Sequence, residues 1–292
     1  MQLLYLKGWY KRRWPVADNS FSLAYKNRGT WLDRCSGASK LLGFVLLSGI
    51  AMVVLDTRFL IFLVILSLVL LKISRVKMSE VAALMKLVLV FMAINLVMIY
   101  VLAPNYGSQI YQSKDILLGS GYFALTQQEL LYLVNIGLEY IVAVPLALIF
   151  LLTTNPSEFA ASLNRIGVPY KISYSVSLAL RYIPDVTREY HQISLSQQAK
   201  GNEISKKAPF FKRLKGASAI LVPLLLSSID RIESVSQAME LRRFGAKKRR
   251  SWYFSEKLKA LDWVVLSFVL LIVIFGFILI IVNGGRFWNP FH

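Results

Sequence analysis

The chain has few of the residues on which catalysis, metal binding and covalent cross-linking depend. Its 292 residues include one cysteine, Cys35, and two histidines, His191 and His292. A single cysteine excludes an intrachain disulfide and argues against a cysteine-based metal site. Neither histidine belongs to a metal-ligand motif, and Gly-x-Ser-x-Gly and phosphate-binding Walker sequences are absent. We therefore expect no enzymatic activity, cofactor or metal site, and any ATP would be hydrolysed by another chain.

Acidic residues are also scarce, with 16 Asp and Glu against 34 Lys and Arg, a formal net charge of +18. Such a charge can attract nucleic acid, anionic lipid or an acidic protein. The chain is also 56% hydrophobic, with a mean hydropathy of +0.53, which is too apolar for an ordinary soluble domain. In a membrane protein, Lys and Arg gather in cytoplasmic loops, which accounts for much of the charge. The first residues do not resemble a cleaved signal peptide.

Long apolar runs predict an all-α polytopic membrane protein with about five transmembrane helices and a cytoplasmic module of long amphipathic helices. The runs cover residues 41–55, 59–73, 81–103, 130–152 and 261–282. The first two are shorter than the roughly 17–25 residues of an ordinary span and predict a tight hairpin around Asp56-Thr57-Arg58. Glu139 lies inside the fourth run and is a candidate functional residue, although a buried glutamate that faces other helices is the simpler interpretation.

The distribution of cations predicts the orientation. Lys and Arg are expected mainly on the cytoplasmic side of the membrane, and in the predicted topology only Arg58, Lys114 and Arg286 lie on the outer side. The N-terminus is then in the cytoplasm, and the cell is expected to be prokaryotic. The chain is accordingly divided into a cytoplasmic or interfacial segment (1–40), a transmembrane bundle of about four helices (41–152), a cytoplasmic module (153–260), and a last transmembrane helix with an outer C-terminus (261–292). The cytoplasmic module is too long to be a simple loop.

The cytoplasmic module is expected to begin with a short helix. Asn155 can cap its N-terminus, Pro156 fits its first position, and the negative charge of Glu158 is favourable near the positive end of the helix dipole. A second helix is expected over about 170–199, kinked at Pro184, and a basic link over 202–215. The third helix is expected over about 217–243, with a bend at Pro223.

The two long helices carry apolar stripes at helical spacing. Packing within this chain or on a lipid surface explains most such stripes, and packing on a partner is the alternative. The stripe residues taken as candidate packing positions are Ile172, Val176, Ile183, Pro184, Val186, Ile193, Leu221, Leu225, Ile232 and Val235.

Each long helix ends with a cation close to a glycine, in Ala199-Lys200-Gly201 and in Leu241-Arg242-Arg243-Phe244-Gly245. Positive charge at a helix C-terminus is favoured by the last carbonyl groups, so capping alone explains one such ending. Two of them, on the longest cytoplasmic helices of a membrane protein, suggest cations that dock into acidic grooves of a partner.

From these motifs the chain resembles the transmembrane T components of energy-coupling-factor (ECF) importers, including the related cobalt-transporter subunits. The motifs that carry the resemblance are Thr154-Asn155-Pro156, Leu180-Arg181-Tyr182-Ile183-Pro184, Gln198-Ala199-Lys200-Gly201 and Ala238-Met239-Glu240-Leu241-Arg242-Arg243-Phe244-Gly245. The resemblance implies two ATP-binding-cassette (ABC) ATPase subunits that receive Ala199-Lys200-Gly201 and Leu241-Arg242-Arg243. It also implies a membrane-embedded S component that packs on the stripe residues and topples on ATP hydrolysis to deliver a vitamin or a transition-metal ion.

The sequence departs from the two Ala-Arg-Gly motifs of that family. Lysine replaces arginine at Lys200, and the second motif has Leu241 for alanine and Arg243 for glycine. Lysine keeps the charge but loses the planar fork of arginine. Arg243 could serve in place of Arg242, although Ala238-Met239-Glu240 favours Arg242. The alternatives are another permease or channel subunit and a basic membrane-anchored interaction protein; a nucleic-acid partner is not expected, because no stacking platform or recognition motif accompanies the basic tract.

Overall fold

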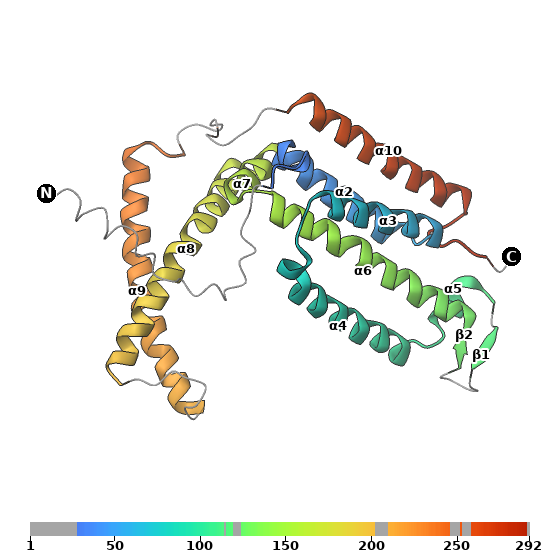
Figure 1. Ribbon diagram of the computed structural model, residues 1–292, viewed down its shortest axis with the longest axis horizontal. Helices are drawn as coiled ribbons and strands as arrows, with labels where there is room; N and C mark the ends of the chain where they lie inside the picture. The colour runs from blue at the N-terminus through green and yellow to red at the C-terminus, as the bar shows by residue number, and fades with distance from the viewer. Residues whose placement is uncertain are drawn as a thin grey trace, which may run out of the picture.

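The computed structural model describes residues 28–113, 115–118, 124–201, 210–245, 252 and 258–290. The described residues are almost entirely helical, which confirms the all-α membrane fold class (Figure 1). Most of the predicted N-terminal segment, the cation Lys114 and the basic tract Lys247–Arg250 lie outside the described residues.

Five of the helices form a bundle: α2 (Gly37–Val53), α3 (Thr57–Ile73), α4 (Met78–Leu102), α6 (Gln127–Thr153) and α10 (Ala260–Val282). A short 3-10 turn, η1 (Leu32–Arg34), precedes α2. Three stretches of the described chain are long and apolar enough to cross a membrane, namely Val81–Leu102, Gln127–Thr153 and Ala260–Val282. The helices α2 and α3 have 17 residues each, the lower limit for an ordinary span, so their crossing of the bilayer stays a prediction.

The core of the bundle lies where α2, α3, α6 and α10 meet, around fully buried Leu60, Leu63 and Val142. The helix α4 packs mainly along α6, with Phe91 against Tyr140, and its start shares a buried cluster with Leu71 of α3 through Val81. Most of its side chains are exposed. A helix that is apolar on every side and exposed in isolation needs lipid or another protein around it.

The predicted hairpin between α2 and α3 is present, and the end of the described chain holds it in place. Asp56 accepts hydrogen bonds from the backbone amide of Arg58 (2.9 Å) and from Nδ2 of Asn283 (2.8 Å). Arg286 donates to the carbonyl oxygens of Met52 (2.8 Å) and Val53 (3.0 Å). One carboxylate therefore caps α3 and joins it to the end of α10.

The expected loop between α4 and α6 contains more structure than the sequence suggested: α5 (Tyr106–Tyr111) and a small antiparallel pair, β1 (Ile116–Leu118) and β2 (Leu125–Thr126). The buried carboxylate of Glu129 accepts a hydrogen bond from the amide of Gly107 at 2.6 Å. A Cβ on Gly107 would lie 2.6 Å from the Cα of Glu129, so only glycine fits this approach.

Two carboxylates from distant parts of the chain meet the N-terminus of α2. Glu158 Oε1 accepts from the amide of Gly37 (2.7 Å), and Asp262 Oδ1 accepts from the amide of Ser36 (2.7 Å). The first amides of a helix have no partners inside it and carry partial positive charge, which explains the position of both acids. Lys40 donates to the carbonyl oxygen of Thr153, at the C-terminal end of α6 (2.8 Å). These bonds fix the joint between the bundle and the helices that follow.

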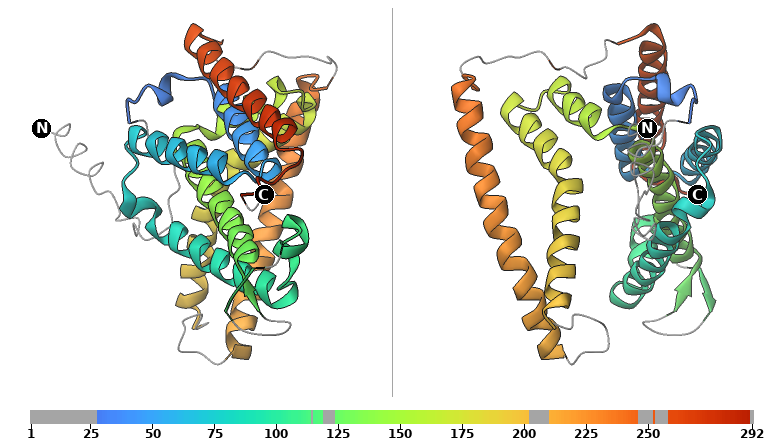
Figure 2. Two further views of the ribbon diagram at one scale, coloured as in Figure 1. Left: turned by 90° about the vertical axis from the view of Figure 1, so that its right-hand side faces the viewer. Right: turned by 60° about the vertical axis from the view of Figure 1, so that its left-hand side comes forward.

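The remaining helices are α7 (Pro156–Arg165), α8 (Tyr170–Ala199) and α9 (Phe210–Leu241). Asn155 caps α7 as predicted, by accepting from the amide of Ser157 at 3.2 Å. The predicted bounds of α8 are confirmed, but α9 begins seven residues earlier than about Ala217, so part of the expected link is helical. Both α8 and α9 continue through Pro184 and Pro223. Figure 2 shows α8 and α9 to one side of the bundle, with α7 between.

Candidate interaction site at the ends of two crossing helices

The C-terminal ends of α8 and α9 have the same backbone construction. Lys200 and Arg242 each follow the last helical residue, and the next residue in each case is left-handed, with φ +83° at Gly201 and +52° at Arg243. The amide of Gly201 donates to the carbonyl of Gln198, and the amide of Arg243 donates to the carbonyl of Glu240. This is the αL ending that commonly closes a helix.

Because the two helix ends share one backbone conformation, their residues can be aligned, and the alignment answers whether Arg242 or Arg243 matches Lys200. Arg242 corresponds to Lys200, and Arg243 corresponds to Gly201. The positive φ favours glycine at this point, since a residue without a Cβ adopts it at little cost. Arginine at position 243 departs from that rule.

The helices α8 and α9 are antiparallel and cross one another (Figure 1). Their C-terminal ends therefore lie at opposite ends of the pair, with Lys200 at one and Arg242 at the other. Lys200, Arg242 and Arg243 are all exposed. The pair thus presents one lysine-tipped end and one doubly cationic end, separated by most of the length of α8.

A polar network joins the two helices near their crossing. Arg231 on α9 donates to Glu189 on α8 at 2.6 Å, and Ser227 donates to the same carboxylate. The guanidinium carbon of Arg231 lies 5.8 Å from the ring centroid of Tyr182. Gln197 also donates to the carbonyl of Ala219, at 3.2 Å. Charge-assisted bonds of this kind are stronger and more directional than apolar contacts, so they fix how α8 meets α9.

Aromatic side chains hold the Arg242 end of α9 against the start of α8. The ring of Phe244 lies 4.5 Å from that of Tyr174 and 5.9 Å from that of Tyr170. Trp252 packs on Tyr170 at 5.3 Å and donates through Nε1 to Asn164 on α7, at 3.1 Å. The sequence motif contains Phe244 but gives no sign of the residues that it contacts.

The predicted packing residues fall into two groups. Val176, Val186, Ile193 and Val235 are half-buried, and Val186, Val235 and Ile232 line a cleft of about 380 Å³ between α8 and α9. The second group is exposed. It consists of Pro184, Ile172 (55%), Ile183 (58%), Leu221 (50%), Leu225 (61%) and Ile232 (64%), of which Ile232 lies at the cleft. Apolar exposure on this scale marks a surface that another protein or lipid covers.

Two further candidates do not join this site. Glu139 is half-buried within α6, away from the α8–α9 pair, and its role stays a prediction. His191 is exposed on α8, where its ring contacts that of Tyr190. Among the described residues there is no group of three or more His, Cys, Asp or Glu that could hold a metal ion.

Several residues that hold the helices together could not be identified from the sequence. Glu189 and Arg231 form the interhelical ion pair, and Glu158 and Asp262 meet the start of α2. Glu158 lies in the first turn of its own helix, α7, as predicted, and its carboxylate also accepts from the amide of Gly37 at the start of α2. No sequence signal identifies such pairs, because their members lie 42 to 226 residues apart.

The sequence is similar to a known protein family and to several transporter components. The family model of the cobalt transport protein CbiQ matches residues 28–253. The energy-coupling factor transporter transmembrane protein EcfT of Exiguobacterium sibiricum is 27% identical over 180 residues, 58% of this chain and 66% of the relative. The protein of the same name from Staphylococcus aureus is 33% identical over 152 residues, 49% of this chain and 56% of the relative.

A third relative has a different name. An ABC transporter ATP-binding protein of Bifidobacterium longum is 27% identical over 161 residues, which make up 52% of this chain but only 20% of that protein. The chain thus spans about two thirds or less of the relatives that it matches. The family match covers the bundle helices and the α8–α9 pair together. The chain belongs to the cobalt transport protein family CbiQ and is a relative of the transmembrane components of energy-coupling-factor transporters.

Proposed function

We propose that the chain is the coupling subunit of an ECF-type importer. In this role it links ATP hydrolysis by two ABC ATPase subunits to the movement of a membrane-embedded S component, which carries a vitamin or a transition-metal ion into the cell. The chain itself performs no catalysis.

The observation that carries the proposal is the equivalence of the two helix ends. Lys200 and Arg242 stand at matching backbone positions on a crossing pair, at its opposite ends. Two separate ATPase subunits could each receive one cation in an acidic groove. Arg242 can form a bidentate pair with a carboxylate, whereas Lys200 acts as a point charge, so the two contacts are unequal.

The Bifidobacterium relative supports an ATPase partner. Its name describes an ATP-binding protein of an ABC transporter, and about one fifth of its length resembles this chain. A chain of this kind and an ATP-binding protein therefore occur within one polypeptide, which is expected of parts that work together.

Exposed apolar side chains support the S component as the second partner. Ile183 on α8 and Leu225 and Ile232 on α9 are more than half exposed, next to a bundle that spans the membrane. An apolar, membrane-embedded protein would cover such a surface and would move when the α8–α9 pair moves.

The distribution of described cations supports a cytoplasmic position for α7, α8 and α9. Lys40, Lys72, Lys77 and Lys259 lie at the end of the bundle that joins α7, whereas Arg58 and Arg286 lie at the other end. Cytoplasmic ends of membrane proteins carry the excess of Lys and Arg. The division into bundle and cytoplasmic module is proposed on this basis.

Copurification tests the proposal. The tagged chain, expressed together with the proteins encoded next to it and extracted in mild detergent, should bring down ABC ATPase subunits and a small membrane protein. A double variant Lys200→Glu, Arg242→Glu should lose the ATPase subunits and keep the small membrane protein. A chain that purifies alone under these conditions would overturn the proposed function.

A further inference from the structure

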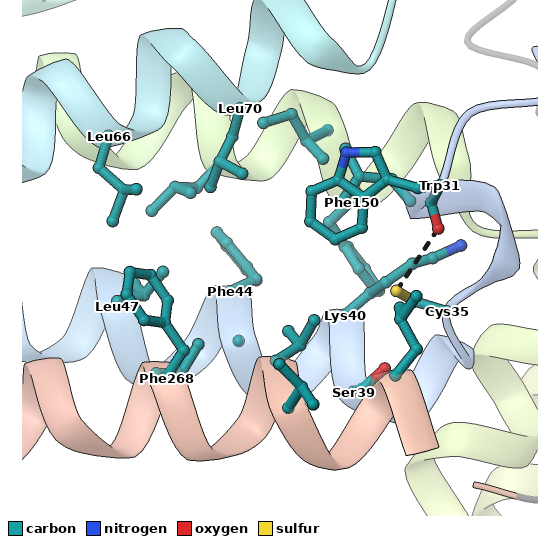
Figure 3. A pocket seen from close by; sticks show the side chains of 18 residues that line it. Trp31, Cys35, Ser39, Lys40, Phe44, Leu47, Leu66, Leu70, Phe150 and Phe268 are labelled. Carbon is teal, nitrogen blue, oxygen red and sulfur yellow. Dashed lines mark hydrogen bonds between the residues drawn. The ribbon is translucent and has the colours of Figure 1, made fainter. Parts of the chain in front are cut away.

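The bundle contains an apolar cavity of about 470 Å³ between α2, α3, α6 and α10 (Figure 3). This volume falls within the roughly 300–1,000 Å³ typical of small-molecule sites. Phe44, Leu47 and Phe268 point into it from α2 and α10, with Leu66 and Leu70 opposite on α3. Nothing in the coupling function described above uses this space.

The position of the cavity along the bundle is well defined. It is lined by the first turns of α2 and α10 and by Leu146, Ile149 and Phe150 near the end of α6. These segments lie in the half of the bundle that joins α7. Under the orientation proposed above, this half faces the cytoplasmic leaflet of the membrane.

The polarity of the cavity changes from one end to the other. Lys40 lines it with its aliphatic chain, and its ammonium group reaches the carbonyl of Thr153 at 2.8 Å. The ammonium group of Lys259 lies beside the same end, 3.4 Å from the carbonyl oxygen of Arg34. Trp31, at 38% exposed, covers this end, as tryptophan commonly does at headgroup depth.

Nearby acids do not cancel this charge completely. Asp262 is buried and accepts bonds from Ser36, Ser39 and the amide of Lys259. Asp33 accepts bonds from Thr30 and from the amide of Arg28. Glu158, which accepts from the amide of Gly37, is a third carboxylate at this end of the bundle. The described cations Arg28, Arg34, Lys40 and Lys259 outnumber these three carboxylates by one.

An apolar cavity at membrane depth with cations at its headgroup end matches one class of ligand. We propose that it binds an acyl chain of an anionic phospholipid from the cytoplasmic leaflet, with the lipid phosphate near Lys40 and Lys259. Basic pockets between transmembrane helices recognise anionic headgroups in this way. The stem of Lys40 then contacts the acyl chain while its charge faces the phosphate.

Quenching of tryptophan fluorescence by brominated lipid tests the site directly. The full chain is reconstituted in vesicles of phosphatidylcholine and phosphatidylglycerol, with bromine on the acyl chains of one lipid or the other. The chain has six tryptophans, so the signal of Trp31 is taken as the difference from the Trp31→Phe variant. Brominated phosphatidylglycerol should quench Trp31 at least about fivefold more effectively than brominated phosphatidylcholine, since each basic side chain near an anionic lipid contributes about 1 kcal/mol.

Two matched pairs of variants separate the acyl site from the headgroup site. Gly43 lines the cavity, and a Cβ there would meet only Val269, at 3.8 Å, so Gly43→Phe should fill the cavity and remove the quenching. Gly49→Phe, on the same helix but outside the cavity, should leave the quenching unchanged. Lys259→Gln should reduce the preference for phosphatidylglycerol, whereas Lys72→Gln, at the same end of the bundle, should preserve it.

Three results would overturn the proposal. Equal quenching by both lipids would mean ordinary surrounding lipid without a headgroup site. Absence of quenching by either lipid would mean that protein fills the cavity. Unchanged quenching in Gly43→Phe would place the lipid elsewhere. None of these measurements involves an ATPase or an S component, so failure of the lipid site and failure of the proposed coupling function are distinguishable.

Discussion

Arg231 Nη2 lies 2.6 Å from Glu189 Oε2 where α9 meets α8, and both side chains are largely buried, at 31% and 19% exposed. This ion pair is the strongest polar link described between the two helices that end in Lys200 and Arg242. A charge-assisted hydrogen bond of this kind favours one arrangement of the two helices.

Removing one partner of this pair should loosen the crossing. In Arg231→Met the carboxylate of Glu189 stays partly buried without its partner, at a cost of about 1–3 kcal/mol. Spin labels on exposed Ser175 of α8 and Gln237 of α9, in a Cys35→Ser background, should then report a broader distance distribution. The exchange Glu189→Arg, Arg231→Glu should partly restore the narrow distribution; equal broadening in the exchange and in Arg231→Met would contradict a specific ion pair.

Charge reversal at either cationic end should abolish energised uptake. Lys200→Glu and Arg242→Glu place negative charge against the acidic grooves proposed on the ATPase subunits, so we expect at least a tenfold loss of uptake with normal membrane insertion. Lys200→Arg should retain uptake, since the charge is kept. Arg181→Glu, an exposed reversal in the middle of α8, is the control and should have a smaller effect than either end. Wild-type uptake in both end variants would rule out this docking site.

Substitutions of the left-handed residues Gly201 and Arg243 should change the stability of the two helix ends in opposite directions. Gly201→Ala introduces a Cβ at φ +83°, where nothing lies within 4 Å, so the backbone conformation alone should cost about 1 kcal/mol. Arg243→Gly removes the same cost at φ +52° and should stabilise the end of α9 by about 1 kcal/mol. Hydrogen exchange of the last turn of each helix measures both effects. If Arg242 makes the main ATPase contact, Arg243→Gly should also keep most of the uptake.

Cys35 should be unreactive at ordinary pH. Its side chain is 2% exposed, and burial, helped by the charge of Asp262, raises the thiol pKa from 9.0 to about 11. The thiolate is the reactive form, so a maleimide at pH 8 should label the protein only after unfolding in detergent. Between pH 9 and 11 the folded chain retains a proton that the unfolded chain has lost, and stability should therefore fall as the pH rises through this range. Rapid labelling of the folded protein at pH 8 would contradict the buried position.

Much of the fold could be predicted because the determining signals are local. The bounds of α8 follow from Pro169 just before its first residue and Gly201 two residues after its last. The apolar content of α10 is enough to predict a span. The start of α9 was misplaced because Lys212, Arg213 and Lys215 were interpreted as a basic link. These residues are also good helix formers, and Pro209 just before Phe210 marks a favourable start.

The positions of Lys200 and Arg242 in the chain, the charge of each and the likeness of the two endings were determined by the sequence alone. Periodicity and capping signals act within a few residues, so they are visible without a structure. Only the tertiary structure decided that the two ends lie at opposite ends of a crossing pair, that Arg242 rather than Arg243 corresponds to Lys200, and that Glu189 and Arg231 join the helices. Such relationships depend on contacts between segments far apart in the chain, which local residue patterns do not encode.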